Sequence, residues 1–343
     1  MHPISVLIPT RNCAALIPDH LQSLRPWLDL ADEVVVVDSD SHDGTLELLR
    51  AGLNHPRVRF LNHPPGLYQS WNFGIQSLSA KYTYISTVGD GIQRAGLEHL
   101  LEWAEKLQSD VVISKPAFIN AAGHPLPDQR WPIDLILHHL RIRQPQLLST
   151  TEQFLFAVTN LWGAILGSSA SNLYRTECLQ KRPFPTDFGT AGDLAWSLQN
   201  IFDLKIVVTP ERFSTFRFHE KPYAPEDYYV ESLLLKLFRL AQEVVARQAA
   251  RRSAVRRILE EMHWSDLETA LAIVPARQAE LEQFRRQITP WFLNLRAWQA
   301  RAARNQAERK ISLITGLVVA AAPAPGLRRE VPRTEVQVSL EKP

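Results

Sequence analysis

Short apolar runs alternate with amphipathic segments over the first third of the chain. Residues 34–37 are four consecutive valines, a β-branched run that is apolar on both faces, as in a central strand of a parallel sheet. The segments between the runs repeat apolar residues at helical spacing. Strands are predicted at residues 4–8, 34–37, 58–61, 82–87 and 111–114, and helices at residues 16–24, 45–51, 68–78 and 95–107.

This alternation predicts an α/β fold, a three-layer sandwich with a mostly parallel sheet between two layers of helices. After residue 114 the pattern becomes irregular, with a further strand at residues 205–208. Ligands of such sheets bind beyond the carboxyl ends of the strands, so the residues that follow each strand are the candidates for function.

Charge and periodicity both change near residue 220. Residues 1–235 carry 19 Lys and Arg against 25 Asp and Glu, a net charge of −6, whereas residues 236–310 carry 15 against 8, a net charge of +7. Pro222 and Pro225 lie close to this change. We predict a first domain over residues 1–220, a helical C-terminal region over 221–310 and a flexible tail over 311–343.

The composition is that of a globular protein: 343 residues, 45% hydrophobic and 22% charged. A formal net charge of +2 gives no global basic field, so nucleic acid is not an expected partner. Two cysteines, Cys13 and Cys178, exclude a disulfide scaffold and a cysteine-based zinc site. The most apolar stretch, residues 311–325, is interrupted by polar residues and is shorter than the ~20 residues of a spanning helix. Without a secretory signal pattern at the start, we expect a soluble, cytoplasmic protein.

Polar residues follow three of the predicted strands. If those strands are neighbours, their tips converge, and the carboxylates repel one another unless a cation is bound or some are protonated. Oxygen ligands suit Mg²⁺ or Mn²⁺, which bridge phosphates. No Gly-rich phosphate loop of the ATPase or NAD type is present. The tips read Pro9-Thr10-Arg11-Asn12, Asp38-Ser39-Asp40-Ser41-His42-Asp43 and Val88-Gly89-Asp90.

Together with a fourth block, these tips resemble the successive motifs of family 2 glycosyltransferases over about residues 4–220. The resemblance implies the GT-A nucleotide-sugar-binding fold for residues 1–220, with a nucleotide-sugar donor as partner. The blocks are residues 5–12 (SVLIPTRN), 35–45 (VVVDSDSHDGT), 72–75 (NFGI) and 84–90 (YISTVGD).

In that family the tip of the first strand and the aspartate after the second hold the nucleoside. Asp43 precedes a Gly-Thr-Leu-Glu helix start, and for this residue we favour a capping role. The resemblance implies as nucleotide-sugar-binding residues Pro9, Thr10, Asn12, Asp38, Ser39, Asn72 and Asp90.

The Asp-x-Asp block of the family binds the diphosphate through a divalent metal, and here only its last aspartate, Asp90, is present. The resemblance implies that Asp90 binds Mg²⁺ or Mn²⁺, with a turn residue as the alternative. His219 is a second candidate ligand, with a structural role as the alternative. Arg217 is either a phosphate contact or a surface charge.

Residues 188–196 (FGTAGDLAW) resemble the family's acidic motif at the start of a helix, which implies Asp193 as the general base. The acceptor hydroxyl must lose its proton as it attacks the anomeric carbon opposite the leaving nucleotide, a geometry that inverts this carbon. Helix capping is a second, compatible role. The Gln-x-x-Arg-Trp signature of processive relatives is absent, so we expect the transfer of one sugar.

Aromatic and basic residues elsewhere leave alternatives open. Trp131, Trp162 and Trp196 either stack on an acceptor sugar or pack in the core, which is the commoner fate of tryptophan. The basic helical region carries Trp291 and Trp298 among arginines. It either contacts the inner face of a membrane peripherally, joins two subunits in a homo-oligomer, or packs on the first domain.

The leading interpretation is an inverting glycosyltransferase that moves one sugar to a glycan or lipid-linked acceptor in surface polysaccharide or glycolipid synthesis. A non-catalytic GT-A-like binding or scaffold protein is the alternative that the reduced metal block allows, although Asp193 argues against it. A sugar nucleotidyltransferase would need a Gly-rich basic loop after the first strand, which residues 11–15 (RNCAA) do not supply.

Overall fold

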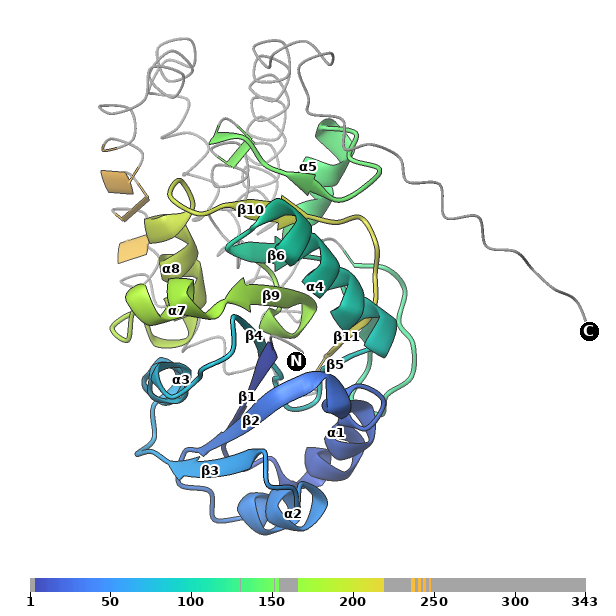
Figure 1. Ribbon diagram of the computed structural model, residues 1–343, viewed down its shortest axis with the longest axis vertical. Coiled ribbons are helices and arrows are strands. Elements are labelled where there is room, and N and C mark those ends of the chain that lie inside the picture. Colours follow the sequence, from blue (N-terminus) through green and yellow to red (C-terminus); the bar gives the residue numbers. More distant parts are fainter. Residues whose placement is uncertain are drawn as a thin grey trace, which may run out of the picture.

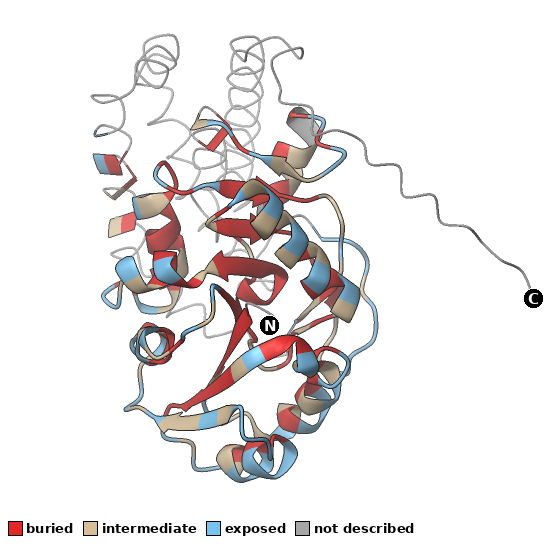
Figure 2. Ribbon diagram, in the orientation of Figure 1, coloured by how far each residue is buried: buried red, intermediate tan, exposed pale blue. Residues whose placement is uncertain are grey.

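The central strands are buried on both faces. In β1 (Ile4–Thr10) and β2 (Ala31–Asp38), alternate residues belong to two separate hydrophobic clusters, with Leu7 in one and Val6 in the other. A strand covered by helices on both sides needs such an uninterrupted apolar run. The central strands are accordingly largely buried, and the helices expose their outer faces (Figure 2).

The protein was analysed as a computed structural model, which describes residues 4–129, 131–150, 152–153 and 166–218, with residues 236, 237, 240, 241, 243, 244 and 247. The main sheet has the strand order β3-β2-β1-β4-β9-β6-β10-β8 (Figure 1). Its pairs are parallel except those made by β8 and β9, which confirms the predicted α/β sandwich with a mostly parallel sheet. Its other strands are β3 (Val58–Asn62), β4 (Tyr82–Ile85), β6 (Val111–Ile113), β8 (Gln146–Leu147), β9 (Asn172–Arg175) and β10 (Ile206–Val208).

Helices cover the two faces of this sheet (Figure 1). One face carries α1 (Ile17–Leu24), α2 (Thr45–Gly52) and α4 (Arg94–Leu107). The other carries α3 (Leu67–Gln76), α5 (Pro132–His139), α7 (Thr176–Lys181) and α8 (Gly192–Asn200). Short 3-10 turns are η1 (Ala14–Leu16), η2 (Leu28–Leu30), η3 (Ser169–Ser171) and η4 (Gly189–Ala191).

A second, three-stranded sheet has the order β5-β11-β7. It consists of β5 (Gly91–Ile92), β7 (Ala117–Ile119) and, between them, β11 (Ser214–Arg217). Strand β11 pairs antiparallel with β5 and parallel with β7. The sequence pattern did not predict this sheet, which brings Arg217 next to the loop after β4.

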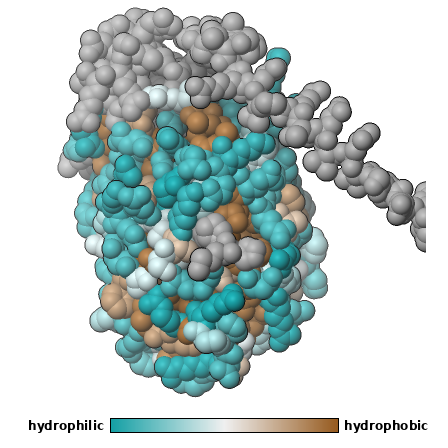
Figure 3. Space-filling model, viewed as in Figure 1, coloured by the Kyte–Doolittle hydropathy of each residue, from teal (hydrophilic) through white to brown (hydrophobic). Residues whose placement is uncertain are grey.

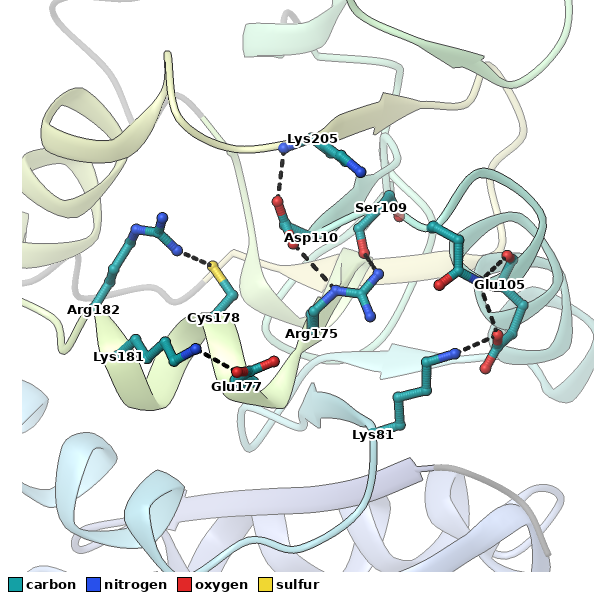
Figure 4. A network of polar contacts seen from close by, with 11 residues as sticks. Lys81, Glu105, Ser109, Asp110, Arg175, Glu177, Cys178, Lys181, Arg182 and Lys205 are labelled. Carbon is teal, nitrogen blue, oxygen red and sulfur yellow. Dashed lines mark hydrogen bonds and ion pairs between the residues drawn. The ribbon is translucent and has the colours of Figure 1, made fainter.

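The amino edge of the main sheet is closed by a polar network (Figure 4). Asp110, just before β6, accepts hydrogen bonds from Arg175 Nε at 3.1 Å and from the backbone N–H of Lys205 at 2.9 Å. Arg175 also donates to the carbonyl of Ser109 at 2.8 Å. These polar groups hydrogen-bond to one another, so this edge of the sheet has a structural role. The candidates for function lie at the opposite edge.

Seven described positions beyond residue 218 are helical. Leu237, Ala241 and Val244 are buried in the hydrophobic cluster that also contains α8, and Lys236 pairs with Asp187. The rest of the predicted helical region 221–310 and the predicted tail 311–343 lie outside the described residues, as do the proposed membrane and subunit contacts. The division at residue 220 therefore stays a prediction.

The described residues include no helix that is long and apolar enough to cross a membrane. The face of the molecule drawn in Figure 3 is mostly hydrophilic, with small apolar areas between polar side chains.

Candidate active site

One side of the site is built where β1 and β2 end together. Asp38 is buried, and its carboxylate accepts hydrogen bonds from Thr10 Oγ1 at 3.0 Å, the backbone N–H of Ser41 at 2.9 Å and Ser41 Oγ at 2.6 Å. Pro9 pairs in register with Val37, just before these residues. The structure therefore brings Pro9, Thr10 and Asp38 together at the carboxyl edge, as the sequence predicts.

The loops that follow these two strands are joined by hydrogen bonds. Asn12 Oδ1 accepts the backbone N–H of His42 at 2.9 Å, and the backbone N–H of Asn12 donates to Ser41 Oγ at 3.0 Å. Asn12 and Asp40 both adopt left-handed backbone conformations, with φ of 45° and 59°. Such conformations are uncommon outside glycine and concentrate at ligand sites, where the surrounding structure holds them.

Asp43 lies one residue before Gly44, the N-cap residue of α2, and binds the start of this helix, close to the capping role that the sequence favours. Its Oδ1 accepts the backbone N–H of Thr45 at 3.1 Å, at the start of α2, and its Oδ2 accepts the N–H of Ala14 at 2.9 Å. The hydrogen bonds from Thr45 and Ala14 lower the pKa of the Asp43 carboxyl. Asp43 thus joins the start of α2 to the loop after β1.

The first turn of α3 connects this nucleotide-side loop to the predicted base. Ser39 Oγ and Ser70 Oγ lie 2.6 Å apart, and both side chains are buried. Two residues earlier, the Tyr68 hydroxyl donates to the carbonyl of Thr190 at 3.1 Å, and it lies close enough to Asp193 to lower the pKa of that carboxyl. Sequence reasoning missed Tyr68 and Ser70; their only signal was a polar-aromatic first turn shortly before the Asn72 block.

Asp193 is the second residue of α8 and is half-buried. Burial raises the pKa of its carboxyl to about 6, against hydrogen bonds from the N–H of Leu194, at 2.7 Å, and from Tyr68. Gly192 lets this helix start approach α3, since a Cβ there would lie 2.4 Å from Tyr68 Cδ2 and 2.5 Å from the carbonyl oxygen of Pro185. A carboxyl with this pKa can take up a proton near neutral pH.

Asp90 lies on the other side of the site and is enclosed. Its Oδ1 accepts the backbone N–H of Arg217 at 2.9 Å, and its Oδ2 accepts Thr87 Oγ1 at 2.9 Å and Ser168 Oγ at 3.1 Å. Burial raises the pKa of this carboxyl to about 6, and these hydrogen bonds oppose the rise. Arg217 is buried as well, so it is not the surface charge that the sequence left open.

The described residues do not form a ligand set for Mg²⁺ or Mn²⁺. No three His, Cys, Asp or Glu side chains among them are grouped closely enough to hold a metal ion. Val88 packs against the hydrophobic cluster under α1 and α4, and Gly89 has no side chain, so the 88–90 loop offers one carboxylate, which already accepts three hydrogen bonds. His219, the second predicted ligand, lies outside the described residues.

Asn72 is used within the fold. Its Nδ2 donates to the carbonyl of Phe184, its Oδ1 accepts the N–H of the same residue, both at 2.8 Å, and it lines a shallow hollow that extends to the last turn of α8. Both polar atoms of its amide therefore have a partner within the fold, and the nucleotide contact of this residue stays a prediction.

The tryptophans that the structure describes are mostly core residues. Trp196 is fully buried and Trp71 is buried over the sheet. Trp131 packs against Phe118 and Phe216, with ring centroids 5.2 Å apart in each case. Trp162 lies outside the described residues.

Comparison with known proteins relates this fold and site to a family. Residues 5–162, a little under half of the chain, match the model of glycosyl transferase family 2. None of the curated proteins matches the chain.

Solved structures share the fold at low sequence identity. S. aureus TarS 1-349 in complex with UDP-GlcNAc aligns with a TM-score of 0.55 and 15% identity, and its complex with UDP aligns at 0.51 and 17%; each alignment covers 93% of this chain and 92% of that chain. The mannosyltransferase PcManGT from Pyrobaculum calidifontis, in complex with GDP-Man and Mn²⁺, aligns at only 0.49, with 18% identity over 93% and 85% of the two chains. The family 2 match over residues 5–162, together with a GT-A-like fold, thus supports a glycosyltransferase.

Proposed function

We propose that this glycosyltransferase moves one sugar, with inversion, from a nucleotide-diphospho-sugar to a hydroxyl of a glycan or lipid-linked acceptor. The observation that carries the proposal is the first turn of α3, whose Ser70 contacts the strand-tip loop while its Tyr68 contacts Asp193. One helical turn thereby lies next to both the strand-tip loop and the half-buried carboxyl of Asp193.

The strand-tip loops bind the nucleotide in this proposal. The loops after β1 and β2, which hydrogen-bond to each other, expose polar groups beside the buried Thr10–Asp38 pair. TarS, which has the same fold, has been solved with UDP and with UDP-GlcNAc, which supports a nucleotide-sugar as the donor class. The nucleotide-side residues are Pro9, Thr10, Asn12, Asp38 and Ser39.

Asp193 is the proposed general base. The acceptor oxygen forms a bond to the anomeric carbon while the bond from that carbon to the diphosphate oxygen breaks, and the hydroxyl proton passes to the Asp193 carboxylate. The nucleoside diphosphate leaves with the electron pair of the broken bond. A pKa of about 6 leaves the carboxylate ionised at neutral pH and still basic enough to accept the proton.

A divalent cation, when bound to such an enzyme, stabilises the charge of the departing diphosphate. Since the described residues do not form its ligand set, the proposed steps above do not depend on one. The setting in surface polysaccharide or glycolipid synthesis, on the cytoplasmic side, rests on the family resemblance.

A panel of nucleotide-sugars tests the function, with release of nucleoside diphosphate in the presence of a glycan or lipid-linked acceptor as the readout. The expected result is release from one or two donors that grows with acceptor concentration. Binding of a donor without any release would favour the scaffold alternative. Release of pyrophosphate from a nucleoside triphosphate and a sugar phosphate would favour the nucleotidyltransferase alternative.

A further inference from the structure

We propose that Asp90 is an internal anchor that fixes β11 to the 87–90 loop together with Arg217, and that the nucleotide is bound without a divalent cation at this carboxylate. The second half of this inference rests on the proposed function. It departs from the metal role that the family resemblance implies for Asp90.

The contacts of Asp90 all come from the protein interior. Its two oxygens accept three hydrogen bonds, from the loop itself (Thr87), from the segment before β9 (Ser168) and from β11 (the N–H of Arg217). The residue is 9% exposed. Three of the roughly four lone-pair sites of this carboxylate are used by donors from three different parts of the chain, which leaves little room for a cation.

The side chain of Arg217 completes the anchor from the opposite side. Its Nε donates to the carbonyl of Gly89 at 3.1 Å, one terminal nitrogen to the carbonyl of Ala121 at 2.7 Å, and the other to Asp19 of α1 at 3.2 Å. The guanidinium therefore holds the 87–90 loop, the turn after β7 and α1 in one arrangement. Each of its three nitrogens donates a hydrogen bond within the protein, so we assign it as a positioning residue for this loop.

The amino edge of the sheet contains a second pair of an aspartate and an arginine, which serves as a control for Asp90 and Arg217. Asp110 and Arg175 hold the starts of β6 and β10, at the edge opposite the nucleotide loops (Figure 4). Asp110→Asn weakens the ion pair between Asp110 and Arg175, which lies away from the site. It therefore separates the structural effect of such a change from an effect on a ligand.

The test compares the parental protein with Asp90→Asn, Arg217→Lys and Asp110→Asn. Thermal midpoints are measured together with calorimetric affinities for UDP and GDP, in Mn²⁺ and in EDTA. We expect Arg217→Lys and Asp110→Asn to lower the midpoint by roughly 5–15 °C, because each leaves a buried partner unmatched. Asp90→Asn should lower it less, because the amide oxygen can still accept the N–H of Arg217 and burial already disfavours the ionised Asp90. We expect the parental protein to bind its nucleotide with equal affinity in Mn²⁺ and in EDTA, and Asp90→Asn to keep that equality.

The proposal is overturned if Mn²⁺ strengthens parental binding and Asp90→Asn removes this gain at an unchanged midpoint. Electron paramagnetic resonance of Mn²⁺ with UDP, on the parental protein and on Ser168→Ala, decides the same point if Asp90→Asn fails to fold. A nucleotide-dependent, protein-bound Mn²⁺ signal that Ser168→Ala alters would contradict the proposal. If neither nucleotide binds in either condition, the proposed function fails, whereas the anchor is still judged by the midpoints.

Discussion

Two carboxyl groups at the carboxyl edge of the sheet share a raised pKa, of about 6, and the same cause, burial, yet they differ in access. Asp90 is surrounded by three donors from three parts of the chain. Asp193 is half-buried at the start of a helix, with Tyr68 and one N–H of its own helix as partners. Access to the carboxylate, more than its pKa, therefore distinguishes a candidate base from an anchor.

Replacing Asp193 with Asn should lower turnover by about 10²–10⁴-fold, the usual contribution of a general base, and leave donor affinity nearly unchanged. Asn keeps the volume of the side chain. Burial makes the ionised Asp193 unfavourable for folding above pH 6, so its removal should not lower the thermal midpoint at pH 7.5. Rate, donor affinity and midpoint are measured on one preparation, and near-parental turnover would place the base elsewhere.

The rate should also depend on pH through Asp193. Below its pKa of about 6 the base is protonated and can no longer take up the proton of the acceptor hydroxyl. We therefore expect kcat/KM to fall as the pH falls through 6, by about tenfold per pH unit well below pH 6. The measurement is a pH profile of kcat/KM for the acceptor at a saturating donor concentration. The carboxyl of Asp90 has a similar pKa, so a control must separate the two carboxyls. If Asp193 causes the fall in kcat/KM near pH 6, the pH profile of the residual activity of Asp193→Asn should lack this fall. A fall that persists in the variant would assign it to another group.

At residue scale, the sequence predicts which residues lie at the ends of strands better than it predicts contacts between helices and loops that are far apart in the chain. Thr10 and Asp38 are adjacent because parallel neighbours end together, which periodicity reveals. The amide of Asn72 pairs with Phe184, 112 residues further along the chain, a contact that the sequence did not predict. The bond between Tyr68 and Thr190 spans 122 residues, and no local pattern encodes such a contact.

At the scale of elements, the site depends on how closely α8 approaches α3. The closest approach is at Gly192, under the ring of Tyr68 and beside the carbonyl of Pro185. Tyr68 in turn stacks on Phe184, with ring centroids 5.4 Å apart. The position of Asp193 is therefore set by backbone packing one residue earlier.

Gly192→Ala should move the start of α8 away from α3, since the added methyl group would lie within 2.5 Å of rigid neighbours. Overpacking of this kind costs about 1–3 kcal/mol of folding free energy. It should also reduce kcat more than donor affinity, because Asp193 shifts while the strand-tip loops do not. Gln199→Ala, at an exposed position of the same helix, is the control and should leave both quantities unchanged. A fully active Gly192→Ala enzyme would show that the contact does not position the base.

Elements with many apolar residues were predictable, and short ones were not. The strands predicted at residues 34–37 and 111–114 lie within or overlap β2 and β6, because each is buried on both faces. Strand β5 has 2 residues and β11 has 4, too few for a period-2 pattern to stand out. Their pairing depends on Arg217 and Asp90, a contact between distant segments.

At the scale of the whole molecule, one hydrophobic cluster extends beyond the GT-A unit. Leu237, Ala241 and Val244 follow one another at helical spacing and are buried with residues of α3, α5 and α8. Lys236 adds an ion pair to Asp187 and lies 4.2 Å from the ring centroid of Phe188. The described helical positions are thus part of the core behind the proposed base.

Leu237→Ala should destabilise the GT-A unit itself. Removing a buried leucine side chain costs about 2–4 kcal/mol, and the midpoint should fall by roughly 5–15 °C. Glu243→Gln, at an exposed position of the same segment, is the control and should change the midpoint little. Calorimetry would show one transition at a lower temperature for Leu237→Ala. An unchanged midpoint would mean that the segment contributes nothing to the stability of the unit.

Strand β9 carries a consequence for how the protein is synthesised. It lies between β4 and β6, although both precede it in the chain. A growing polypeptide therefore presents one side of β4 and of β6 without their final partner until residue 175 has left the ribosome, and open strands of this kind are prone to aggregate. The segment that matches the family model ends at residue 162, before β9, so a protein trimmed to that segment would keep this gap permanently.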